Sequence, residues 1–161
     1  SIGDHIVLAN RGNALNRKNH LVVTNNYFWE RQKETPLYLV HLLPPANVSG
    51  FIGVSDIFYV KSNNVLLLTL SSEATNNSYD DGAIGNSYIG WINDITHKIG
   101  NAELKLDGMI NLSEVSDEFN GEKIEGICVE SVTDDNCMLH LVSDDDNGES
   151  KLFKIKMNLK R

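Results

Sequence analysis

The sequence predicts an all-β fold for this chain of 161 residues, and two observations carry the prediction. Apolar residues come in short runs rich in β-branched and aromatic side chains, and the runs end at Asn, Asp, Ser or Gly. The helical period is almost absent, and a few turn-like stretches, such as residues 113–119, have the composition of one short helix. The predicted strands are HIVLAN, HLVVTNN, PLYLVHL, DIFYV, VLLLTLSS, SYIGWIND, GICVES, MLHLVSDD and KLFKIKMNL.

Composition limits the classes of partner. With 41% hydrophobic residues, residues 1–161 can form a single domain or part-domain with a real core. The formal net charge of −8 makes nucleic acid and anionic membrane surfaces poor partners. The longest apolar run, Val65 to Leu70, is far below the roughly 20 residues that span a bilayer. We expect a soluble protein of the bacterial cytoplasm or periplasm, and the sequence does not decide between these compartments.

Three similar units follow one another, at about residues 5–50, 51–112 and 120–159. Each unit has a polar entry, a strand, a turn, a more apolar strand ending in polar residues, a loop and another strand. In the second unit, AELKLDGMINL (residues 102–112) can add a fourth strand. This pattern is typical of β-propeller blades, in which antiparallel four-stranded sheets pack face to face. An ordinary β-sandwich or meander is the alternative.

Several segments resemble a known family. RGNAL, GVSDIFYV, YDDG, KIEG and SDDD, taken in this order, are similar to the C-terminal half of an uncharacterised bacterial β-propeller family, a domain of unknown function. That family is distantly similar to esterase-like and phytase-like propellers, which share EGI followed by an aspartate-rich strand end. The resemblance implies a propeller fold and no established activity. Family members look about twice as long, which implies that this chain is a fragment.

Ring closure sets the expected partner. Three blades do not readily close a ring, since propellers typically have about 4 to 8. We therefore expect about half of a roughly six-bladed ring, completed by an N-terminal half of the same protein or by a second copy.

The acidic segment SDDDNGES (residues 143–150) is not an EF-hand loop. With Gly148 at position 6 of such a loop, position 12 is Lys154 instead of a bidentate glutamate, and a strand follows. Asn147-Gly148 is more simply a turn between two strands. Asp144 differs from its neighbours, because it stands at the end of an apolar strand.

Polar residues at strand ends predict a site in the channel. If equivalent ends of successive blades converge, the oxygen-bearing residues there form a ring of Asn13, Asn25, Asp56, Glu73, Glu125 and Asp144. Oxygen ligands suit Ca²⁺ or Mg²⁺. We expect Asp56, Glu73, Glu125 and Asp144 as ligands of a Ca²⁺ ion, whereas the alternative is that these residues only cap turns.

Further ligand contacts are expected from the glycine-rich loop of residues 76–91 and from Arg11. Asp80 and Asp81 lie in this loop, whose glycines do not have dinucleotide-binding spacing. Arg11 is the best-placed cation, and it can equally pair with Glu125 or Asp56. Arg11, Asn13, Asn25, Asp80 and Asp81 are therefore the predicted ligand-binding residues, and Trp91 is expected in a core or blade interface.

Two function classes remain open. In the first, the chain is a binding module whose acidic channel mouth takes a cation, a small molecule or a peptide. In the second, it is a calcium-dependent phosphoesterase or esterase of the phytase-like propeller type, in which the metal activates water. The catalytic residues of the second class are incompletely represented, so the first is favoured. Cys128 and Cys137 form no metal motif, and we expect buried thiols more than a disulfide.

Overall fold

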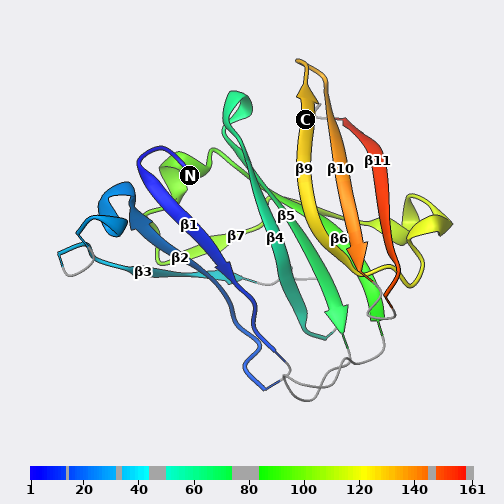
Figure 1. Cartoon of the computed structure of the whole chain (residues 1–161), viewed down its shortest axis with the longest axis horizontal. Helices are drawn as coiled ribbons and strands as arrows, with labels where there is room; N and C mark the ends of the chain where they lie inside the picture. The colour runs from blue at the N-terminus through cyan, green and yellow to red at the C-terminus, as the bar shows by residue number, and fades with distance from the viewer. Residues whose placement is uncertain (14, 32–33, 44–49, 74–83, 145–147, 159–161) are drawn as a thin grey trace.

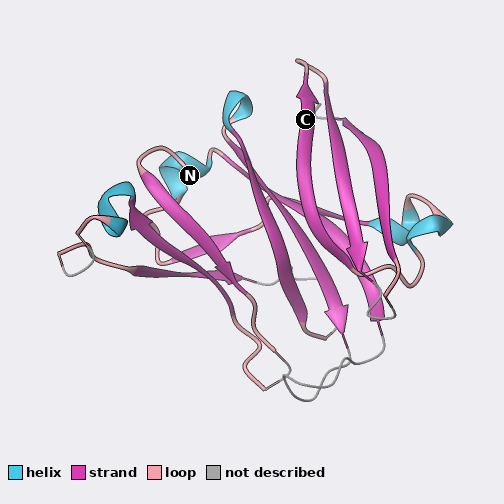
Figure 2. Ribbon diagram, viewed as in Figure 1, coloured by secondary structure: helices cyan, strands magenta, loops and turns pink. Residues whose placement is uncertain are grey.

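A computed structural model describes residues 1–13, 15–31, 34–43, 50–73, 84–144 and 148–158 (Figures 1 and 2). Within these residues eleven strands form three sheets, ordered β1-β2-β3-β7, β4-β5-β6-β8 and β11-β10-β9, which we call the first, second and third sheet. The strands are β1 (His5–Asn10), β2 (Asn19–Asn25), β3 (Tyr38–Leu43), β4 (Ile52–Val60), β5 (Val65–Glu73), β6 (Ile84–Asn93), β7 (Glu103–Lys105), β8 (Gly108–Asn111), β9 (Ile124–Val132), β10 (Asn136–Asp144) and β11 (Ser150–Asn158).

The all-β prediction is confirmed, and the three sheets are consistent with part of a propeller. In the described part of the chain, helical structure is confined to short pieces: η1 (Asn26–Trp29), η2 (Lys61–Asn63), α1 (Ile95–Lys98), η3 (Leu112–Glu114) and η4 (Asp117–Phe119). The last two fall where the sequence predicted one short helix. None of the helices in the described ranges has the length and apolar character needed to cross a membrane.

The second sheet lies between the other two and has a hydrophobic core on each face. Successive side chains of a strand point to opposite faces. Leu66, Leu68 and Leu70 of β5 accordingly join the core shared with the first sheet, whereas Val65 and Leu67 join the core shared with the third. The nearly continuous apolar run of β5 is therefore explained by burial on both sides.

The fourth strands of the first two sheets come from one extended segment. Residues 102–112 were expected to supply a fourth strand to the second unit, and β8 does so by pairing antiparallel with β6. The preceding part of the segment, β7, pairs in parallel with β3 of the first sheet. The segment thus joins two sheets, and Leu104 and Leu106 are buried in the core between them.

Strand directions also differ between the units. In Figure 1, β1, β5 and β10 point to one end of the molecule, which we call the junction end, whereas β2 and β9 point to the other. Consecutive antiparallel strands alternate in direction, so four strands in a row would return the chain to its starting direction. Only three strands of the first sheet precede β4, because the fourth, β7, comes later in the chain. The apolar strand β2 of the first unit therefore runs opposite to its predicted equivalents, β5 and β10.

Candidate functional site

Arg11, the residue after β1, connects the first sheet to the second at the junction end. Its guanidinium donates from Nη1 to Ser55 Oγ at 3.3 Å and from Nη2 to Ser71 Oγ at 3.0 Å. The side chain crosses β4 over Gly53, where an added Cβ would lie 2.3 Å from Arg11 Nε. Glycine at position 53 is therefore required for Arg11 to reach these two hydroxyls.

Two β-bulges place the residues that meet Arg11. In β4 the extra residue is Ser55, between Val54 and Asp56, and in β9 the extra residue is Glu125. A bulge inserts one unpaired residue, so the side chains after it change face. Asp56 consequently faces the third sheet instead of the first. The signal was present in the sequence, because apolar residues of IGVSDI and IEGI are three apart where strict alternation requires two.

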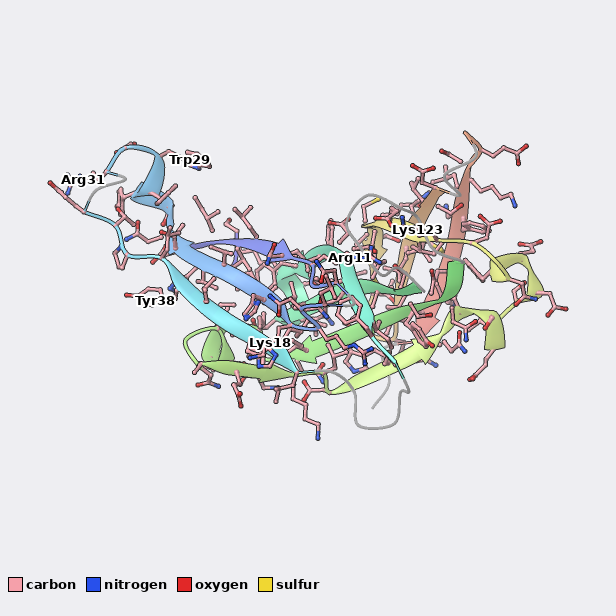
Figure 3. All side chains as sticks on the ribbon, turned by 90° about the horizontal axis from the view of Figure 1, so that it is seen from below. Arg11, Lys18, Trp29, Arg31, Tyr38 and Lys123 are labelled. Atoms are coloured by element: carbon pink, nitrogen blue, oxygen red, sulfur yellow. The ribbon has the colours of Figure 1, made fainter. Side chains whose placement is uncertain are left out.

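Glu125 lies between two cations at the meeting point of the three sheets. Its Oε1 atom is 3.6 Å from Arg11 Nη1 and 3.5 Å from Lys123 Nζ, and the Lys123 side chain is only 12% exposed. Figure 3 shows these two basic side chains close to each other. Neither distance is within the about 2.7–3.2 Å of an ordinary hydrogen bond. Oε1 is itself buried, and it accepts no hydrogen bond from the described residues.

Asp56 connects the second sheet to the third. Its Oδ2 accepts a hydrogen bond of 2.9 Å from the backbone N–H of Ile127 in β9, and its Oδ1 accepts one of 2.8 Å from Ile57 N. Both carboxylate oxygens are thus engaged by backbone donors. We call Arg11, Ser55, Asp56, Ser71, Lys123 and Glu125 the three-sheet junction.

The structure does not bring Asn13 and Asn25 together. Asn13 lies in the β1–β2 connection at the junction end, and its Oδ1 accepts from Leu15 N and Asn16 N. Asn25 ends β2 at the opposite end of the sheet, where its Oδ1 accepts from Tyr27 N. Each asparagine caps a local turn, as in the alternative interpretation of the predicted ring. The reversed direction of β2 is the reason that Asn25 is far from the junction.

The other predicted site residues have different outcomes. Asp144 ends β10 at the junction end, is exposed, and donates its backbone N–H to Lys123 O at 3.0 Å. Glu73 ends β5, where its backbone pairs with Ile84, and its side chain falls outside the described part. Asp80 and Asp81 also lie outside the described residues.

The described residues contain no group of three or more His, Cys, Asp or Glu side chains arranged to hold a metal ion. The expected Ca²⁺ ligands Asp56, Glu73, Glu125 and Asp144 therefore stay a prediction. Of these four, the described side chains of Asp56 and Glu125 already contact donors or cations.

A second polar cluster was missed by sequence reasoning. The Glu122 carboxylate, whose side chain is 8% exposed, accepts from Ser143 Oγ at 2.5 Å and pairs with Lys151 Nζ. Its backbone carbonyl accepts from Ser87 Oγ at 2.8 Å. These partners come from three different strands, so no local pattern predicts the cluster.

Elsewhere, charged partners shift two carboxyl groups. The hydrogen bond from Lys154 holds the pKa of Glu130 below its ordinary value, and His140 contributes in the same direction. Burial alone raises the pKa of Asp107, but hydrogen bonds from Lys98 and from the backbone of Asn93 outweigh burial and lower it. Both groups lie away from the junction.

The cysteines form no disulfide. Cys137 is buried, and burial raises the pKa of its thiol, whereas Cys128 is exposed on the outer face of β9. The expectation of two buried thiols is thus correct for Cys137 and wrong for Cys128. Trp91 packs against the core between the second and third sheets, as expected.

Comparisons with known proteins give one finding. Residues 1–148 match the model of a family described as a family of unknown function, DUF6910. No curated protein and no solved structure matches the chain. The match confirms the expected resemblance at its coarser level, an uncharacterised domain family, and leaves the likeness to esterase-like and phytase-like propellers a prediction.

Proposed function

We propose that this chain, which belongs to the family of unknown function DUF6910, is a binding module whose three-sheet junction takes a small polar molecule. The ligand carries an N–H donor for Glu125 and an anionic group for Arg11 and Lys123. Free amino acids have this combination of groups.

One observation carries the proposal: Glu125 Oε1 is buried without a hydrogen-bond donor among the described residues. Buried polar atoms in folded proteins nearly always have a partner, and leaving one without costs about 1–3 kcal/mol. A ligand N–H supplies the donor that the described residues do not. The neighbouring guanidinium and ammonium groups of Arg11 and Lys123 attract an anionic group to the same place.

The alternative function is a calcium-dependent phosphoesterase or esterase, in which Ca²⁺ held by carboxylates activates water. Two contacts make this alternative less favoured. Both oxygens of Asp56 accept backbone hydrogen bonds, and Glu125 has two cationic neighbours that repel a divalent cation.

The test is isothermal titration calorimetry, in which the chain is titrated with each free amino acid and, separately, with CaCl₂. We expect at least one amino acid to bind, and Glu125→Gln to weaken its binding about tenfold or more. A hydrogen bond to a charged group is worth about 1.5–3 kcal/mol, and about 1.4 kcal/mol is a tenfold change.

Glu34→Gln is the matched control, because Glu34 is exposed and donates its backbone N–H to Arg31, which Figure 3 shows far from Arg11. The affinity of this variant for the amino acid should equal that of the unaltered chain. Absence of binding by every amino acid would contradict the proposal. Calcium binding together with turnover of a phosphoester or carboxylic ester would establish the alternative instead.

A further inference from the structure

The outer faces of the first and third sheets each present an apolar row. Figure 1 shows these two sheets on opposite sides of the second sheet, so each has one face directed away from it. Both inner faces are covered by a neighbouring sheet and form the two cores. In this molecule, therefore, the element that covers a sheet face is another sheet.

On the first sheet the row consists of Leu8, Val22 and Leu39, which lie directly opposite one another on β1, β2 and β3. Leu8 is 56% exposed and Leu39 is 66% exposed. His20 and His41 lie on the same face, two positions from Val22 and Leu39 along β2 and β3 toward the junction end. The centres of their rings are 5.4 Å apart. The face thus has an apolar row beside a row of imidazole groups.

On the third sheet the corresponding row consists of Gly126, Val142 and Leu152, which are paired across β9, β10 and β11. Val142 is 44% exposed and Leu152 is 68% exposed. Two residues nearer the junction end, the same face carries Asp144. This face thus has an apolar row with the Asp144 carboxylate toward the junction end and the ion-paired His140, Glu130 and Lys154 on the other side.

The two faces are complementary when the junction ends of two chains point the same way. Strand for strand, Val22 and Leu39 then lie opposite Val142 and Leu152, and Leu8 lies opposite Gly126. The imidazole row lies opposite Asp144. Burying the exposed leucines and valines of the two rows favours such contact by about 25 cal/mol per Å² of apolar surface removed from water.

From this complementarity we infer that two copies of the chain associate head to tail, with the first sheet of each copy on the third sheet of the other. When a two-fold rotation relates the copies, both contacts form at once and the assembly closes with six sheets. The same chain supplies both uncovered faces, which is why a second copy is the occupant instead of an N-terminal half or another protein.

The test is sedimentation velocity over a range of protein concentrations. The unaltered chain should reach twice 17.9 kDa. Each contact of the dimer contains one Leu39 and one Leu152. Either Leu39→Lys or Leu152→Glu therefore introduces a charge into both contacts, and each variant should be monomeric. An equimolar mixture of the two variants should restore the dimer. In a mixed dimer, one contact places the introduced lysine opposite the introduced glutamate, and the other contact keeps both leucines.

Val115→Glu is the control, because Val115 is 59% exposed and lies on neither face; it should dimerise like the unaltered chain. Far-UV circular dichroism should show that every variant keeps its strands, since surface substitutions rarely change stability by more than about 0.5 kcal/mol. A monomer at all concentrations would overturn the inference. A mixture that stays monomeric would also overturn it, because the first sheet of one copy would then not lie on the third sheet of the other.

Discussion

Single residues at the junction end connect the sheets through polar contacts in place of apolar packing. Arg11 crosses over Gly53 to two serines, and Asp56 accepts from the backbone of the neighbouring sheet. Glu122 also joins two sheets, because its carboxylate accepts from Ser143 of β10 and its backbone carbonyl accepts from Ser87 of β6. Each contact depends on one charged group whose removal leaves a partner unsatisfied.

The pair of Glu122 and Lys151 gives the first stability prediction. Lys151→Met should lower the free energy of unfolding by about 1–3 kcal/mol, because a buried carboxylate loses its ammonium partner. Glu122→Gln combined with Lys151→Met should recover part of the loss, since a neutral amide needs no counterion. Urea unfolding measures both changes.

The control for this pair is Lys156→Met on the same strand. Lys156 is exposed and has no ion pair among the described residues, so its replacement should change stability by no more than about 0.5 kcal/mol. Equal effects of the two lysine substitutions would contradict a specific role for Lys151.

At the scale of elements, β8 depends on a glycine. Gly108 lies directly opposite Trp91, and an added Cβ would be 2.0 Å from Trp91 Cζ2. Gly108→Ala should therefore displace the indole and cost about 1–3 kcal/mol, the usual penalty for overpacking. The measurement is urea unfolding with tryptophan fluorescence in a Trp29→Phe background, which leaves Trp91 as the sole tryptophan.

Gly100→Ala is the matched control, because an added Cβ at position 100 meets nothing within 4 Å. It should leave both the emission maximum and the unfolding midpoint unchanged. If Gly108→Ala behaves in the same way, the ring of Trp91 does not rest on Gly108.

The strands themselves could be predicted from the sequence, because their signals are local. HIVLAN is β1 over its full length, and the polar residues that end β5 and β10 mark their true ends. The split of residues 102–112 between β7 and β8 could not be predicted, because it depends on pairing with β3 and β6, which lie far away in sequence.

The candidate site was predictable only in part, for the same reason. Arg11, Asp56 and Glu125 were singled out as strand-end residues, and a pairing of Arg11 with Glu125 was among the stated alternatives. The prediction for Asn25 assumed that equivalent strands of all units run in the same direction. The direction of β2 is reversed because the fourth strand of the first sheet does not precede β4 in the chain. Glu122 and Lys123 carried no local signal, since their partners come from other strands.

At the scale of the whole molecule, the two cores share the second sheet. Leu21 of the first sheet and Leu139 of the third are both fully buried, one in each core. Between them stand strands β4, β5 and β6, whose side chains alternate between the two cores. Loss of either core therefore uncovers one face of the same central sheet.

This arrangement predicts cooperative unfolding. Leu21→Ala and Leu139→Ala should each lower the free energy of unfolding by about 2–5 kcal/mol, the range for a deleted core leucine. In both variants, made in the Trp29→Phe background, the fluorescence of Trp91 and the far-UV circular dichroism should change in one coincident transition. Val115→Ala, at an exposed position, is the control and should be nearly neutral. All chains are compared at one protein concentration, since association shifts apparent stability. The opposite result is equally specific: if Leu139→Ala changed the fluorescence of Trp91 while much of the strand signal persisted, the third sheet would unfold separately and the shared sheet would not couple the two cores.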